Sequence, residues 1–157
     1  MRLFLKDFER FYNLLTSPEL VGDITDDYGG DMFQATKNAL MSPHELVLMP
    51  TKGTAFTLHC VNSILYEAHL ITTESEKQDV YYNTLISSQW VKDNTLIEAF
   101  ISNIPVIYGA TLYYSQKIGM EHLGVIPNGF LKNENRVDIN IMGCSVDTII
   151  RRLSWLK

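Results

Sequence analysis

Residues 94–124, NTLIEAFISNIPVIYGATLYYSQKIGMEHLG, decide the fold that we expect for this chain. The first part, TLIEAFI at 95–101, is rich in residues that favour β-structure and predicts a strand. Residues 105–118 predict a helix, because proline is favoured in the first helical turn and Gly119 can end the helix. MEHLGVI at 120–126 predicts a second strand. A strand, a helix and a further strand in this order are typical of an α/β arrangement.

Three β-rich runs precede this stretch, at 45–49, 54–61 and 63–72. The turns between them are too short for parallel crossovers, so they predict an antiparallel meander. We expect the remaining elements to be helices over 3–16, 18–24, 33–41, 75–92 and 145–157, a loop over 22–32, and a strand over 136–144 after a polar loop at 127–135. Together these elements predict an α/β (α+β) domain with a mixed central sheet and helices on both faces.

The composition predicts one globular domain over residues 1–157, because 46% apolar and 20% charged residues are ordinary values for such a domain. A net charge of −5 argues against a nucleic-acid partner, which usually needs a basic stripe. No apolar run is long enough to span a membrane, and charges interrupt the N-terminal one, so we expect a cytoplasmic protein. Cys60 and Cys144 lack the clustered spacing of a zinc site, and no metal is expected.

The element order and the helix-closing residues Lys117-Ile118-Gly119-Met120 resemble the Gcn5-related N-acetyltransferase superfamily over roughly residues 44–144. In that fold two parallel strands splay apart, and the pantetheine arm of acetyl-CoA pairs with the first of them. The resemblance implies that these strands are 63–72 and 95–101 in this chain. It also implies that the cofactor contacts include Leu70, Ile71 and Thr72.

The resemblance places the pyrophosphate of acetyl-CoA at residues 72–79, with Lys77 and Gln78 among its contacts. Family members use a glycine-rich turn and a helix N-terminus there, so that backbone N–H groups reach the phosphates. This chain departs from the pattern, because the segment contains no glycine. It carries three carboxylates that would repel phosphate, those of Glu74, Glu76 and Asp79.

Glu67 and His69 are the candidate catalytic bases. They lie two residues apart on one predicted strand, so their side chains share a face. Enzymes of the family often keep a glutamate or an ordered water near this strand to deprotonate the substrate amine. The alternative interpretation is a polar pair that is satisfied by neighbouring hydroxyls or turned to solvent.

The candidate general acid comes from the helix over 105–118. Many family members place a tyrosine four residues before the helix-ending glycine, to protonate the departing thiolate. That position here is Ser115, which the resemblance also puts beside the cofactor. Because serine is a poor acid, Tyr114 is the candidate instead, although each helical residue turns the side-chain direction by about 100°. The alternative interpretation of Tyr114 is a core or rim aromatic.

Two main functional hypotheses follow. The first is an acyl-CoA-dependent N-acetyltransferase that acts on a small amine or a protein amine. The second is a protein that keeps the fold without the chemistry. Its basis is that the small size, the acidic balance and the strand around Glu67 and His69 resemble those of phage-encoded relatives involved in head assembly of short-tailed phages. It implies virion or assembly proteins as partners and a virion-associated location, and the glycine-free segment favours it. A small-ligand sensor that uses the same gap is a third class.

Overall fold

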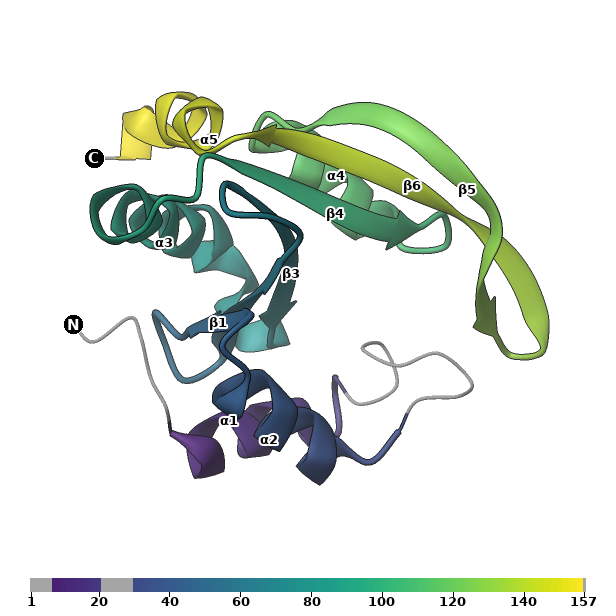
Figure 1. The fold of residues 1–157 in the computed structure, drawn as a ribbon. Coiled ribbons are helices and arrows are strands. Elements are labelled where there is room, and N and C mark those ends of the chain that lie inside the picture. Colours follow the sequence, from purple (N-terminus) through teal and green to yellow (C-terminus); the bar gives the residue numbers. More distant parts are fainter. Residues whose placement is uncertain (1–6, 21–29, 157) are drawn as a thin grey trace.

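A computed structural model describes residues 7–20 and 30–156 of the protein. Within these residues six strands form one sheet in the order β1-β2-β3-β4-β6-β5 (Figure 1). The strands are β1 (Glu45–Leu48), β2 (Thr54–Cys60), β3 (Leu65–Thr72), β4 (Ala99–Pro105), β5 (Glu121–Lys132) and β6 (Asn135–Ser145). The helices are α1 (Phe8–Leu15), α2 (Met32–Met41), α3 (Val80–Asn94), α4 (Gly109–Lys117) and α5 (Val146–Leu153), with short 3₁₀ segments η1 (Glu74–Asp79) and η2 (Ser154–Leu156).

The helices cover both faces of the sheet, as the sequence predicts. On one face, α1 and α2 pack on β1, β2 and the end of β3, in a cluster that includes Phe11, Leu15 and Ile71. On the other face, α3, α4 and α5 pack on a larger cluster that includes Leu85, Phe100 and Ile149. Neighbouring positions of β3 therefore belong to different layers, because side chains along a strand alternate between faces.

The sheet forks between β3 and β4. These two strands run parallel and pair at only three positions, Leu65 with Ala99, Tyr66 with Phe100 and Glu67 with Ile101. Beyond them β3 continues to Thr72 beside β2, while β4 continues to Pro105 beside β6. Figure 1 shows the two strands running away from each other. The prediction of splayed parallel strands is confirmed.

The predicted bounds of the second splayed strand were wrong by several residues. The segment 95–98 is not part of the strand, because Thr95 caps α3 through its N–H and hydroxyl bonds to the carbonyl of Val91. Pro105, which we expected to begin a helix, is the last residue of β4. Proline is tolerated at such a strand end because one missing N–H there disrupts little of the ladder. A turn follows, and α4 begins at Gly109.

The predicted polar loop at 127–135 was also wrong, because β5 and β6 continue through it as one long hairpin. The turn is only Asn133 and Glu134, with φ of 50° and 62°, as in the tight turns that suit twisted hairpins. The hairpin reaches beyond the helices (Figure 1), and most of β5 is exposed. Pro127, Asn128 and Gly129 are residue types that favour turns, and they lie inside β5 where its register with β6 shifts. The sequence there therefore does not alternate like a half-buried strand.

The N-terminal predictions are only partly described. Residues 18–20 form a turn, and the rest of the helix expected over 18–24 lies outside the described residues, as does most of the loop over 22–32. Asp31, at the end of that expected loop, caps α2 by accepting the N–H of Phe33 at 2.9 Å. Among the described residues no helix is long and apolar enough to cross a membrane.

Candidate functional site

The fork exposes backbone groups of β3 that would otherwise pair with β4. The carbonyl of Ile64 accepts bonds from the N–H groups of Glu98 and Ala99, and the carbonyl of Ala68 accepts the hydroxyl of Ser102 at 2.7 Å. The backbone carbonyl groups of Ile64 and Ala68 therefore both point toward β4. Since alternate residues of a strand point the same way, the N–H and C=O of Leu70 point there too, at a level where β4 no longer pairs.

A groove of ≈ 1340 Å³ surrounds this fork. Its walls include Tyr81 and Tyr114 from the α3/α4 side, and Leu15 and Ala39 from the α1/α2 side. The edge of β3 at Leu70 lies between these walls. The groove is therefore lined by residues from both faces of the sheet.

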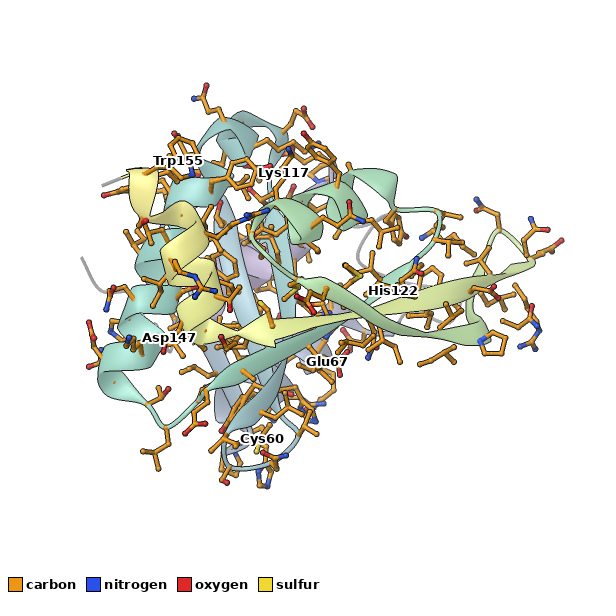
Figure 2. All side chains as sticks on the ribbon, turned by 90° about the horizontal axis from the view of Figure 1, so that it is seen from above. Cys60, Glu67, Lys117, His122, Asp147 and Trp155 are labelled. Atoms are coloured by element: carbon orange, nitrogen blue, oxygen red, sulfur yellow. The ribbon has the colours of Figure 1, made fainter. Side chains whose placement is uncertain are left out.

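Glu67 and His69 lie at the fork, on the face that α1 and α2 partly cover. Glu67 Oε1 accepts a bond from Asn103 Nδ2 of β4 at 2.8 Å and lies 3.2 Å from His69 Nε2. Figure 2 shows Glu67 near the middle of the molecule, away from the outer end of the hairpin. The bond with His69 lowers the pKa of Glu67, with help from Asn103, although partial burial opposes the shift. The structure thus brings the two predicted bases together, and Asn103 is a partner that the sequence did not reveal.

A second glutamate–histidine pair lies on the same face. His59 of β2 is opposite Glu67, and Glu45 of β1 is opposite His59. Glu45 Oε1 and His59 Nδ1 are 2.5 Å apart, and more than half of the His59 side chain is exposed. Glu45 is two strands from Glu67, or about 10 Å at ordinary strand spacing. Only the strand register reveals this pair.

Tyr114, the candidate acid, donates its hydroxyl proton to a hydrogen bond inside the helical layer. Thr84 Oγ1 donates to the carbonyl of Val80 at 2.6 Å and also bonds the hydroxyl of Tyr114. Because Thr84 has one proton, Tyr114 must be the donor in their shared bond. Burial of its hydroxyl is the main cause that raises the pKa of Tyr114. Ser115 is buried and donates to the carbonyl of Thr111 at 2.9 Å, so neither hydroxyl is poised to release a proton into the groove.

The three residues predicted to contact pantetheine, Leu70, Ile71 and Thr72, lie in different environments. Leu70 packs toward α3 and lines the groove. Ile71 is buried under α1 and α2, and its backbone faces β2. The hydroxyl of Thr72 lies 3.0 Å from that of Thr54. Of the three, Leu70 and Thr72 therefore have backbone groups that face the fork, whereas the backbone of Ile71 faces β2.

The predicted phosphate segment forms η1, which leads directly into α3. Gln78 is exposed, and Lys77 Nζ bonds the carboxylate of Glu74. Glu76 is turned toward the β1–β2 connection, where it accepts bonds from the hydroxyls of Thr51 and Thr54. Two of the three carboxylates of the segment, those of Glu74 and Glu76, are therefore bonded within the protein.

A further carboxylate, that of Glu19, reaches the same segment. Glu19 Oε2 accepts the backbone N–H of Glu74 at 3.0 Å. An N–H at the start of a helical segment is the type of group that binds phosphate, and here a side chain of the protein already occupies it. An extended amide chain fits the edge of β3, whereas a diphosphate does not fit this end of the groove. No group of three or more metal-ligating side chains occurs in residues 7–20 and 30–156.

The strand order, the single parallel pair that separates after three positions, and the helix after each of its strands define the Gcn5-related N-acetyltransferase fold. The fold expected from the sequence is thereby confirmed, and the site lies where its two parallel strands part.

Comparison with solved structures agrees with this fold. A spermidine N-acetyltransferase from Vibrio cholerae in complex with CoA and spermine matches with a TM-score of 0.74 at 11% identity, over 96% of both chains. A chimera of the Vibrio cholerae enzyme and hSSAT matches with a TM-score of 0.75 at 12% identity, over 95% of this chain and 96% of that one. An acetyltransferase of the Gcn5-related N-acetyltransferase (GNAT) family from Streptococcus pneumoniae matches with a TM-score of 0.67 at 14% identity, over 89% of this chain and 93% of that one. No protein-family model and no curated protein matches the sequence.

Proposed function

We propose that this protein is an N-acyltransferase, which moves an acetyl group from a thioester of the coenzyme A class to an amine. The observation that carries the proposal is the position of Glu67 and His69 beside the free edge of β3, where β4 departs. The likeness to a spermidine N-acetyltransferase in complex with CoA and spermine supports it. Acceptors of the proposed reaction are small amines or protein amines.

Transfer to an amine needs a base, because an alkylamine is largely protonated at neutral pH and only the free amine attacks. In the proposed reaction the C–N bond forms and the C–S bond breaks, with its electron pair leaving on sulfur. The proton of the amine passes to the base, which contributes roughly 10²–10⁴-fold in such reactions. A thiol has a pKa of about 8.5, so its thiolate leaves without a strong acid.

In this mechanism Glu67 and His69 share the role of the base. With the Nε2 proton directed at Glu67 Oε1, the Nδ1 atom of His69 is left to accept the proton of the amine. The carboxylate stabilises the imidazolium that forms, and Asn103 fixes the carboxylate from the opposite strand. Since almost half of the His69 side chain is exposed, an acceptor can reach it. Tyr114 keeps its hydrogen bond to Thr84 and is not needed as an acid.

The test is an assay of acetyl transfer by the full chain, in which the release of thiol is measured. Spermidine and a lysine peptide serve as acceptors, with acetyl-CoA and S-acetylpantetheine as donors. We expect Glu67→Gln and His69→Asn each to lower kcat/KM by roughly 100-fold or more, with folding retained. Glu45→Gln is the matched control, because it removes the same charge from the other glutamate–histidine pair. Wild-type rates in the Glu67 and His69 variants, or no transfer by the wild-type protein, would refute the proposal.

The head-assembly hypothesis stays a prediction. Nothing in the described structure or in the comparisons bears on a virion partner or on a location in the particle. It would gain support if the protein co-purified with virion proteins, and it would be undercut by a chain that stays alone in an infected lysate.

A further inference from the structure

We propose that the acyl donor of this protein is recognised through its pantetheine arm alone, and that the site disfavours a donor carrying a nucleotide diphosphate. This inference rests on the proposed function and names its donor class. A donor of this class is a thioester of pantetheine without the phosphates of coenzyme A.

The position of η1 carries the first step. The free edge of β3 ends at Thr72, and η1 begins two residues later at Glu74. A chain that pairs with β3 at Leu70 and continues along the strand therefore reaches η1 next. Any diphosphate attached to that chain would meet the start of this segment.

The start of η1 is occupied by the protein's own acceptors. Glu19 Oε2 takes the N–H of Glu74, and the carbonyl of Thr73 takes the N–H of Glu76 at 3.1 Å. The carbonyl of Gly53 takes the N–H of Thr73 at 2.8 Å. The N–H groups of Thr73, Glu74 and Glu76 thus already have partners within the protein.

Contacts with the β1–β2 connection also hold the segment in this position. A Cβ atom at Gly53 would lie 2.4 Å from Thr73 Oγ1 and 2.9 Å from Glu76 Cγ, so the backbone of the β1–β2 connection touches η1 closely. Thr51 and Thr54 fix the carboxylate of Glu76 from the same connection. Opening a phosphate site would require the loss of these contacts together.

The charge of the groove disfavours phosphate as well. Among the described residues that line it, Lys77 is the only lysine or arginine, and its ammonium group is bonded to Glu74. Glu19 and Glu74 line the same end of the groove. Phosphate groups placed there would face two carboxylates and a lysine whose charge is already matched, and such like-charge contact is unfavourable.

The middle of the groove keeps what a pantetheine arm needs. The arm is an uncharged chain with two amides, and the N–H and C=O of Leu70 face it at strand-like spacing. Tyr81 and Tyr114 provide an apolar wall on one side. Ser102 bonds the carbonyl of Ala68, which limits backbone pairing to positions beyond the fork. The features that bind the neutral part of the donor are therefore present while those for its phosphates are replaced.

Direct binding to the full chain tests this inference, with pantetheine and CoA as probes in parallel calorimetric titrations. We expect pantetheine to bind at least as tightly as CoA, although CoA contains the same arm. Glu19→Gln keeps an oxygen acceptor for Glu74 but removes the charge, so it should tighten CoA at least threefold and leave pantetheine unchanged. Added salt should also tighten CoA, because it screens repulsion. Glu98→Gln is the control, since this exposed glutamate lies beside Ile64 at the opposite end of β3.

The outcomes separate the inference from the proposed function. Tighter binding of CoA than of pantetheine by the wild-type protein, or a Glu19→Gln variant with weaker CoA binding, would overturn the inference while acetyl transfer could still be measured. If neither probe binds and neither thioester supports transfer, the proposed function fails together with the inference.

Discussion

Substitution of Gly53 by alanine should disrupt the close contact between the β1–β2 connection and η1, because the added methyl group has no room there. The new Cβ would stand 2.4 Å from Thr73 Oγ1 and 2.9 Å from Glu76 Cγ, closer than real Cβ atoms come, and the first of these neighbours sits on a short, stiff side chain. Either the new methyl group is accommodated with strain, or η1 moves and the bonds of Thr73 N–H and Glu76 are lost. Overpacking of this kind destabilises by about 1–3 kcal/mol, and loss of the Thr73 N–H bond together with the two bonds to Glu76 gives a sum of the same order.

For a chain of 157 residues, a loss of about 2 kcal/mol corresponds to a fall in Tm of roughly 4–8 °C. Thermal unfolding measures this change, and hydrogen exchange at residues 73–77 should become faster in the variant. Gly109→Ala is the control, because nothing lies within 4 Å of a Cβ there and the residue begins α4. If Gly53→Ala melted within 1 °C of the wild-type protein with unchanged exchange, the reasoning about this contact would be wrong.

Three further predictions concern the fork and the adjacent helix. Tyr114→Phe should lower the free energy of unfolding by about 1 kcal/mol through loss of its bond to Thr84, and leave kcat within about threefold; a large fall in kcat would instead identify Tyr114 as the acid. The pKa of Glu67 is lowered from 4.5 in the folded state, so its interactions stabilise the protein above that pH. The difference in free energy of unfolding between the wild-type protein and Glu67→Gln should therefore shrink as the pH falls from 6 to 3. A constant difference in urea unfolding would contradict this. Gly119→Ala should destabilise by about 1–3 kcal/mol, since φ is 101° and a Cβ would lie 2.9 Å from Thr148 Cγ2; an unchanged midpoint in urea would exclude that strain.

Much of the fold could be predicted because its signals are local. The short turns between β1, β2 and β3 dictate antiparallel pairing, and Gly119 ends a helix in a conformation that favours glycine. The spacing of Glu67 and His69 sufficed to place them on one face of one strand. These inferences depend on residues that are close in sequence, which is why a single chain reveals them.

The missed features depend on residues that are distant in sequence. Asn103 meets Glu67 only because the parallel strands align Ile101 with Glu67, and that register cannot be read from either strand alone. Glu19 reaches Glu74 across 55 positions. The true start of β4 depended on whether Thr95 capped α3 or began a strand, and its side chain suits both roles.

The long hairpin has a consequence for the solubility of the protein. Among the described strands β5 lies at the edge of the sheet, so its outer N–H and C=O groups could serve as a template for another chain. Leu123 and Val125, 60% and 49% exposed, would add apolar contact to such stacking. Two register shifts interrupt the strand, however, and Asn128 adopts a φ of 53° within the second. These irregularities break the outer edge into short pieces, so the hairpin can extend into water without inviting strand-by-strand polymerisation.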